Sequence, residues 1–345
     1  MDIQKLKNLL QKYKSAPKEF HVTSYWNAYE KSVIDTISTI DINELRSGKY
    51  PILHTFGFSD VKYIHGHRPS LKKLFIQFLH NFILKDRSIL PYKINLTDIQ
   101  EAAYHHCELL GSICDAKPIK KIEVSTFGNP EDLFEIEGKK YSMNFLAYYI
   151  RYCFAHRYIS FTGNEIMVEL GSGSGHQIEL LKKLYPSLTI LCFDLPAQLY
   201  LCETYLSEAL GKDNIVGTDI TLDWTDLSGL KEGCVHFMGN WQLPLIKDIK
   251  FDIFWNAASF GEMEPHIVEN YLSYVKNQAR WVYLLQSVGK ELTGKASVKN
   301  QTSFEDYNEF MSGYELKKEQ QAWNAHKKNL GTNRSKYFEA VWKKN

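Results

Sequence analysis

The first part of the chain carries apolar residues at the spacing of helix faces. Up to about residue 140 these residues recur three and four positions apart, which is typical of amphipathic helices and not of strands. Glycine and proline residues separate the apolar stretches. The pattern predicts helices over residues 3–13, 25–45, 71–84 and 96–114. We therefore expect a mainly helical N-terminal region over residues 1–140.

A hairpin is expected at the end of this region. The apolar stretches 122–124 and 133–136 lie on either side of the turn-forming sequence Gly128-Asn129-Pro130. This arrangement predicts two short antiparallel strands joined across that turn.

Strands and helices alternate from residue 141 onward. Short apolar runs predict strands over 165–170, 188–193, 235–238, 251–255 and 281–286. Between and around them, helix-spaced patterns predict helices over 141–156, 177–185, 197–210 and 265–276. Such alternation is the signature of an α/β fold, a doubly wound and mostly parallel sheet with crossover helices.

The last part of the chain breaks the alternation. A helix over 304–311 precedes two strands, 314–323 and 336–342, which follow each other closely and suit an antiparallel C-terminal edge. The strands then number seven, and residues 211–233 show no clear pattern. We expect a second domain over residues 141–345, next to the helical region 1–140.

Composition and charge exclude several classes of protein. Of 345 residues, 44% are hydrophobic and 23% are charged, as in a globular protein. The 41 basic and 40 acidic residues give a net charge of +1, which does not favour a nucleic acid partner. The start lacks a secretory pattern and no apolar run is long enough to span a bilayer, so we expect a cytoplasmic protein without a membrane partner. Six cysteines without a Cys-x-x-Cys pair argue against a zinc site or a disulfide framework.

The strongest chemical signal is a glycine-rich turn between a strand and a helix. It runs from Val168 to His176 and reads Val-Glu-Leu-Gly-Ser-Gly-Ser-Gly-His. Glycines let the backbone turn sharply and let a ligand approach closely, and the next helix directs its free N–H groups at the same space. The following strand ends in Asp194, where a carboxylate would accept hydrogen bonds from two ribose hydroxyls.

The spacing within the turn separates nucleotide ligands. A dinucleotide fingerprint requires a third glycine where this chain has His176, and the phosphate-binding pattern Gly-x-x-x-x-Gly-Lys-Ser/Thr is absent from the sequence. What the chain has is an acid followed by alternating glycines: Glu169, Gly171, Gly173 and Gly175. This order resembles motif I of class I S-adenosylmethionine-dependent methyltransferases, and Asp194 matches their ribose-binding acid.

Three further stretches resemble one branch of that superfamily, the putative sugar O-methyltransferases. They are 193–196 (Phe-Asp-Leu-Pro), 256–263 (Asn-Ala-Ala-Ser-Phe-Gly-Glu-Met) and 127–130 (Phe-Gly-Asn-Pro). The likeness runs from about residue 120 to 290. It departs from the branch where Gly-Ser-Gly-Ser-Gly replaces a Gly-Gly-Gly-type turn and where Gly261 replaces a frequent Gln. The resemblance implies a seven-stranded Rossmann-like sheet and S-adenosyl-L-methionine as cofactor.

The resemblance also implies roles for individual residues. The turn around Gly171, Ser172 and Gly173 would lie under the methionine part of the cofactor, and Asp194 would hold its ribose. Leu195 would border the adenine, and Gly239 and Asn240 would close the other side of the base. Asn256 would face the methyl group. With the motif residues Glu169 and Gly175, these positions form the expected cofactor site.

An alcohol acceptor needs a base or a metal, because its pKa lies far above neutrality. Glu262 and His266 follow the fourth strand and are four residues apart, so we expect them on neighbouring turns and take them as candidate bases. The alternatives stay open, since Glu262 would equally suit the start of a helix and a lone histidine is often only solvated. No sequence pattern indicates a metal site: the adjacent His105 and His106 point in different directions on a helix.

The function that these patterns favour is that of an enzyme that methylates a hydroxyl of a sugar or of a sugar-containing metabolite. The expected partner is therefore a small-molecule carbohydrate acceptor. Residues 1–140 would cap the sheet and supply the acceptor pocket, or serve oligomerisation. The alternatives are a small-molecule methyltransferase that acts on a phenol or an amine, an NAD-dependent nucleotide-sugar enzyme, and a binding protein without catalytic activity.

Overall fold

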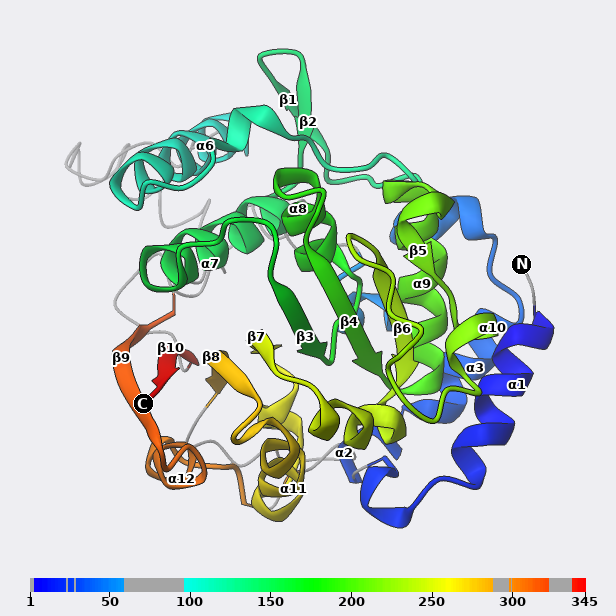
Figure 1. Cartoon of the computed structure of the whole chain (residues 1–345). Helices are drawn as coiled ribbons and strands as arrows, with labels where there is room; N and C mark the ends of the chain where they lie inside the picture. Colours follow the sequence, from blue (N-terminus) through cyan, green and yellow to red (C-terminus); the bar gives the residue numbers. More distant parts are fainter. Residues whose placement is uncertain are drawn as a thin grey trace, which may run out of the picture.

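The structure is a computed structural model that describes residues 3–22, 24–27, 29–58, 96–287, 298, 300–322 and 337–345. Within these residues, one large sheet has eight strands in the order β5-β6-β4-β3-β7-β8-β10-β9. In chain order the strands are β3 (Ile166–Leu170), β4 (Thr189–Asp194), β5 (Ile215–Val216), β6 (Val235–Gly239), β7 (Phe251–Ala257), β8 (Ala279–Ser287), β9 (Tyr314–Gln321) and β10 (Tyr337–Lys344). Figure 1 shows this sheet at the centre of the molecule.

The register confirms a mostly parallel sheet with an antiparallel C-terminal edge. β3 pairs in parallel with β4 on one side and with β7 on the other. β10 runs antiparallel to both β8 and β9. The described sheet has one strand more than the seven expected, because the two-residue β5 extends it beyond β6. That strand falls in the stretch 211–233 without a clear pattern, and two residues are too few to produce a periodic signal.

Helices cover both faces of the sheet, and strand residues alternate between the two resulting cores (Figure 1). On β3, Met167 belongs to the core formed with α7, α8 and α9, whereas Val168 belongs to the core on the opposite face. The helices of the first face are α7 (Met143–Ile159), α8 (His176–Leu184) and α9 (Pro196–Leu210). The second face is covered by η7 (Asn240–Asp248), α11 (Pro265–Val275) and α12 (Phe304–Phe310), where η denotes a 3₁₀ helix.

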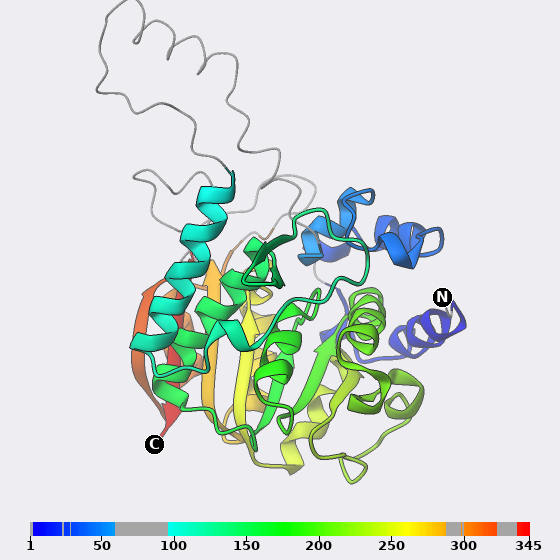
Figure 2. The same cartoon turned by 90° about the horizontal axis from the view of Figure 1, so that it is seen from above.

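The N-terminal region adds helices outside the first face. α1 (Ile3–Lys14) packs against α9, and α6 (Leu96–Ile113) packs against α7. Short elements lie between them: η1 (Lys18–Phe20), α2 (Ser24–Asn27), α3 (Glu30–Ile37), η2 (Ile42–Glu44) and η3 (Pro51–Phe56). Figure 2 shows the first of these helices, in blue, on one side of the sheet. The remaining short elements are η5 (Ile119–Lys121), η6 (Lys212–Asn214), α10 (Thr218–Thr221) and η8 (Phe260–Glu262).

One predicted N-terminal helix is shorter in the structure than expected. The single helix expected over 25–45 is wrong, because α3 ends at Ile37. There the hydroxyls of Ser38 and Thr39 bond to backbone oxygens of Asp35 and Thr36, at 2.7 and 3.1 Å, and so compete with the helical hydrogen bonds. The helix expected over 71–84 lies outside the described residues. The division at residue 140 stays a prediction, and side chains from both sides of it share one core.

The predicted hairpin is also wrong. β1 (Phe134–Ile136) pairs with β2 (Lys139–Tyr141), and the turn is Glu137-Gly138, with φ of 51° and 75°. Two positive φ values in a two-residue loop suit the tight turns that match the twist of a hairpin. Residues 122–124 run alongside β2 and form one backbone–backbone bond with it, from Val124 N to Lys140 O at 2.9 Å; the side chain of Glu123 also accepts from Lys140 N, at 3.2 Å. No helix in the described part of the chain is long and apolar enough to cross a bilayer.

A buried lysine ties the first strands together behind the glycine turn. Lys182 on α8 is 4% exposed, and its ammonium donates to three backbone oxygens, those of Pro186, Leu188 and Gly233, at 2.5, 2.9 and 2.6 Å. These bonds join the end of α8 to the loops before β4 and β6. Burial lowers the pKa of this ammonium.

We expect Lys182→Met to lower the free energy of unfolding by about 2–4 kcal/mol, because it leaves three buried carbonyls without a donor. Urea denaturation measures the change. Lys212→Met, at an exposed position, is the matched control and should stay within about 0.5 kcal/mol of the wild type. Equal stability of the two variants would contradict a structural role for the buried ammonium.

Candidate active site

A cavity of about 400 Å³ opens at the carboxyl ends of β3, β4 and β7. β3 lies between β4 and β7, so the chain continues from here to opposite sides of the sheet, and open α/β sheets bind ligands at such a point. Residues from α7 and from the N-terminal segment complete the wall, among them Tyr148, Arg151, His21 and Trp26. The cavity therefore combines strand ends with side chains far away in sequence.

The glycine turn has the sharply turning backbone that its sequence predicts. Gly171, Gly173 and Gly175 have φ of 77°, 55° and 78°, in the region that side chains with a Cβ disfavour. Asp194 holds the turn: one carboxylate oxygen accepts from Gly173 N at 3.0 Å and the other from Leu195 N at 2.8 Å. Gly171, Ser172, Gly173, Asp194 and Leu195 all line the cavity, as expected of cofactor-binding residues.

Three other predicted cofactor residues lie next to the cavity but do not line it. A Cβ on Gly175 would lie 2.8 Å from Leu206 Cδ1, so this glycine permits close packing against α9. A Cβ on Gly239 would lie 2.3 Å from Trp241 Cη2, so this glycine accommodates an indole ring. Both positions serve packing and are not in contact with the cavity.

Asn256 is the third predicted cofactor residue that does not line the cavity. It is fully buried, and its Nδ2 donates to Leu170 O at 2.8 Å and to Ser259 Oγ at 2.7 Å. Its Oδ1 accepts from Gln286 Nε2 at 2.5 Å. Asn256 thus ties the end of β7 to β3, and the residue after it that reaches the cavity is Ala257.

Two buried carboxyl groups lie side by side at the strand ends. Glu169 is 3% exposed, and burial, followed by the charge of Asp194, raises its pKa to about 8. Burial also raises the pKa of Asp194 to about 6, although backbone N–H donors in the turn act in the opposite direction. Glu169 Oε2 has no hydrogen-bond partner. Burial thus makes the ionised forms of both carboxyls less favourable, and a cationic ligand would stabilise them.

Glu262 reaches the cavity from η8, just after β7. Its Oε2 accepts a hydrogen bond from the indole Nε1 of Trp26 at 2.9 Å. Burial raises the pKa of this carboxyl to about 8; the Trp26 bond lowers it and the charge of Asp194 raises it further. The side chain is partly exposed, and the surface it exposes lies at the cavity.

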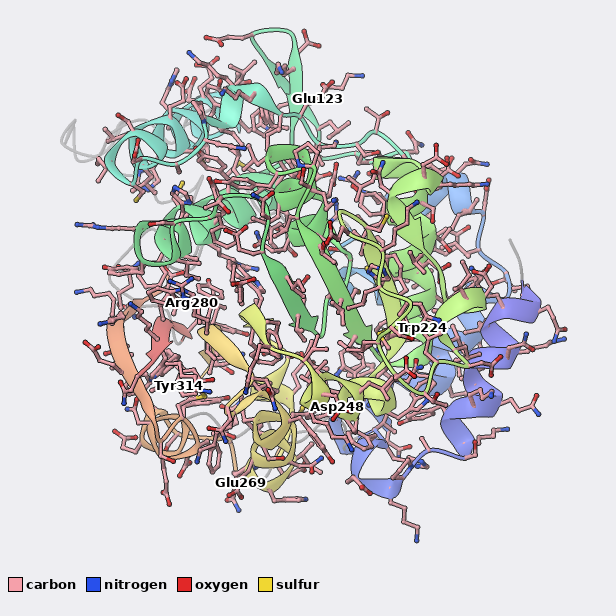
Figure 3. The ribbon with its side chains drawn as sticks, in the orientation of Figure 1. Glu123, Trp224, Asp248, Glu269, Arg280 and Tyr314 are labelled. Carbon is pink, nitrogen blue, oxygen red and sulfur yellow. The ribbon has the colours of Figure 1, made fainter. Side chains whose placement is uncertain are left out.

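The structure does not bring His266 to the cavity. Met263 and Glu264 have extended backbone, and α11 begins only at Pro265, so the spacing of four residues does not place Glu262 and His266 on one helical face. His266 is exposed. Figure 3 shows Glu269, one turn further along, on the outer side of α11. The expectation that both side chains face the acceptor is wrong for His266.

Several polar side chains of the cavity were not predicted from the sequence, among them Gln177, Arg151, Trp26 and Asn144. The amide of Gln177 is buried and neither of its polar atoms has a partner, and Asn240, which was predicted, likewise keeps Oδ1 unpaired. The guanidinium of Arg151 lies 4.6 Å from the centre of the Tyr148 ring. Trp26 and Asn144 also line the cavity. Only Gln177, directly after the turn, had a signal in the sequence; the others reach the site through long-range folding.

Comparison with known proteins yields structural neighbours only. No sequence family matches the chain, and no curated protein sequence matches it. Magnesium protoporphyrin IX methyltransferase from Synechocystis PCC 6803, solved with bound SAH, has 11% identity and a TM-score of 0.40, covering 79% of this chain and all of its own. The pyocyanin biosynthetic protein PhzM has 13% identity and a TM-score of 0.38; the match covers 59% of this chain and 58% of PhzM. The mitomycin 7-O-methyltransferase MmcR has 8% identity and a TM-score of 0.36; the match covers 94% of this chain and 69% of MmcR. The function must therefore be argued from the site.

In addition, among the described residues no group of three or more histidine, cysteine, aspartate or glutamate side chains is placed to hold a metal ion.

The raised pKa of Glu169 predicts a pH-dependent stability. Between its ordinary value and about 8 the folded protein keeps a proton that the unfolded chain has lost, so this carboxyl makes stability fall as pH rises through that window. Glu169→Gln should be more stable than the wild type at pH 8.5, with a difference that shrinks towards pH 5. Thermal unfolding across this range measures it. Glu269→Gln, an exposed carboxyl, is the control, and a Glu169→Gln curve parallel to the wild type would contradict the assignment.

Proposed function

We propose that the protein is an S-adenosyl-L-methionine-dependent methyltransferase that acts on a hydroxyl of a sugar or of a sugar-containing metabolite. The observation that carries the proposal is the charge of the cavity. Its described lining includes three carboxyl groups, those of Glu169, Asp194 and Glu262, and a single guanidinium, that of Arg151. A cationic ligand would relieve their desolvation and mutual repulsion, and the cofactor carries a sulfonium and an ammonium.

The residues around Asp194 fit the nucleoside part of the cofactor. The carboxylate oxygens of Asp194 accept one backbone N–H each and retain further capacity, so they suit ribose hydroxyls. Leu195 and Ile267 offer apolar surface for a base. Asn240 donates its Nδ2 to Phe20 O at 2.6 Å and to Tyr271 Oη at 2.8 Å, which leaves Oδ1 to accept from the amino group of adenine.

The residues around Glu169 fit the amino acid part. An α-amino acid carries an ammonium and a carboxylate, and here a buried carboxyl with an unpaired oxygen lies near a guanidinium. In the described part of the chain, the guanidinium of Arg151 has a cation–π contact with Tyr148 and no hydrogen-bond acceptor. The unpaired amide of Gln177 offers both a donor and an acceptor next to them. We assign Glu169 to the ammonium and Arg151 to the carboxylate.

Glu262 is the base of the proposed reaction. When bound, the cofactor supplies a methyl group on a positively charged sulfur that leaves as a neutral thioether. The acceptor hydroxyl must lose a proton as its oxygen is methylated, and the carboxylate of Glu262 takes that proton. Its pKa of about 8 is higher than that of an ordinary carboxyl, which makes the ionised group a stronger proton acceptor.

The acceptor side of the cavity supports a carbohydrate. Two aromatic surfaces, those of Trp26 and Tyr148, lie among hydrogen-bonding groups of Asn144 and Glu262. Aromatic faces pack against the C–H surface of sugar rings, while amide and carboxylate groups bind the hydroxyls. His21, Val22 and Trp26 line the cavity, which supports the prediction that residues 1–140 supply part of the acceptor pocket. Asn144 and Tyr148 come from α7, in the part of the chain after residue 140.

Ligand binding separates this function from its NAD-dependent rival. In calorimetric titrations, S-adenosylhomocysteine should bind and NAD should not. Arg151→Gln should weaken S-adenosylhomocysteine about tenfold or more, because a charge-assisted bond to its carboxylate is lost. The affinity for 5′-methylthioadenosine, which lacks the amino acid part, should not change. Arg157→Gln, an exposed arginine on the same helix, should leave both affinities unaltered. NAD binding without S-adenosylhomocysteine binding would contradict the proposal.

Glu262→Gln should lower the rate of methyl transfer by about 10²–10⁴-fold, with little change in affinity for S-adenosylhomocysteine. The measurement is transfer of tritiated methyl groups from S-adenosylmethionine to a panel of nucleotide sugars and oligosaccharides. Glu264→Gln, at the N-cap of α11, is the control and should keep its rate. Undiminished transfer by Glu262→Gln would exclude it as the base and would favour an amine acceptor, whose methylation needs no strong base.

A further inference from the structure

An indole from the N-terminal segment contacts the proposed base. Trp26 lies on α2, and its ring packs against those of Tyr25 and Tyr29, with ring centres 5.4 and 6.0 Å apart. Its Nε1 donates to Glu262 Oε2 at 2.9 Å, a normal length for a bond to a carboxylate. The two residues are 236 positions apart in sequence, so the tertiary fold alone brings them together.

The backbone of the base is held independently of this bond. Glu262 N donates to Ser259 O at 3.1 Å, and the preceding Gly261 N donates to Gln286 Oε1 at 3.0 Å. A Cβ on Gly261 would lie 2.5 Å from Ser287 Oγ, so this turn packs closely against the end of β8. The backbone anchors fix Cα of Glu262 but not its three side-chain torsions. The orientation of the carboxylate must come from contacts of the side chain itself.

An indole N–H suits the task of orienting a base. It is only a donor, it does not titrate in the accessible pH range, and it cannot take the proton that the base is to receive. It also binds the ionised carboxylate more strongly than the protonated acid, and so favours the form that catalysis requires.

We propose that Trp26 is a positioning residue of the transfer reaction: its indole N–H orients the Glu262 carboxylate towards the acceptor. The N-terminal segment is then part of the catalytic machinery as well as of the cavity wall. This inference rests on the proposed function, in which Glu262 is the base.

Several groups set the electrostatic environment of Glu262. Asp194 on β4 raises its pKa, and the hydroxyls of Tyr25 on α2 and Tyr337 on β10 interact with its charge. The bond from Trp26 acts in the opposite direction and lowers the pKa. Loss of the indole N–H should therefore leave less of the ionised base at neutral pH.

Nuclear magnetic resonance tests the pairing without an acceptor. In ¹⁵N-tryptophan-labelled protein, Trp26→Phe identifies the indole signal of Trp26 by its loss. In the wild type that signal should shift with a midpoint near pH 8, and Glu262→Gln should abolish the shift. In ¹³C-glutamate-labelled protein, the Glu262 carboxyl signal should titrate about one pH unit higher in Trp26→Phe than in the wild type. Tyr29→Phe, which alters the same aromatic cluster, should leave both midpoints in place.

The methyl-transfer assay gives the catalytic consequence. Trp26→Phe should lower kcat about tenfold and shift the acid limb of its pH profile upward, with KM for S-adenosylmethionine unchanged. An indole signal that does not respond to Glu262→Gln, or coincident Glu262 titrations in Trp26→Phe and the wild type, would overturn the inference. The titrations need no ligand, so a failure of S-adenosylhomocysteine to bind would refute the proposed function and leave the pairing to be judged on its own result.

Discussion

The desolvation of carboxyl groups at the ends of parallel strands is the constraint on which the site depends. β3 and β4 run side by side in register, so Glu169 and Asp194 emerge at the same edge of the sheet. Glu262 enters the same cavity from the segment after β7. Burial raises the pKa of all three groups, and like charges raise those of Glu169 and Glu262 further. Such a cluster is unfavourable when its carboxyls are ionised and the cavity holds no ligand. A cationic ligand binds favourably because it is attracted by the same negative charges.

The fold builds this cluster from two kinds of element. The sheet supplies the glycine turn and the acids, with Asp194 bonded to the backbone of the turn and Asn256 joining β7 to β3. Elements outside the sheet supply the remaining groups, namely Arg151 from α7 and Trp26 from α2. In the function that we propose, the sheet holds the cofactor, and the outer elements complete its amino acid subsite and the acceptor side.

The sequence predicted those features of the fold and of the site that depend on local patterns of residues. Short apolar runs indicated the strands, and the position of Glu169 and Asp194 at strand ends indicated where the cavity lies. The sequence could not show which glycines face the ligand, since Gly171 and Gly175 share one motif although a Cβ on Gly175 would meet α9. The sequence misplaced His266 because the spacing of four residues does not reveal that the backbone is extended, and not helical, just before Pro265. Trp26 and Arg151 had no signal, because only tertiary contacts bring them to the site.

Proton release upon ligand binding tests the central electrostatic claim most directly. Calorimetric titration of the protein with S-adenosylhomocysteine at pH 7, in two buffers with different enthalpies of ionisation, measures the number of protons exchanged. If the ligand's ammonium meets the carboxyl of Glu169, whose pKa in the free protein is about 8, binding releases protons to the buffer. Binding with no net release, or with proton uptake, would contradict the account.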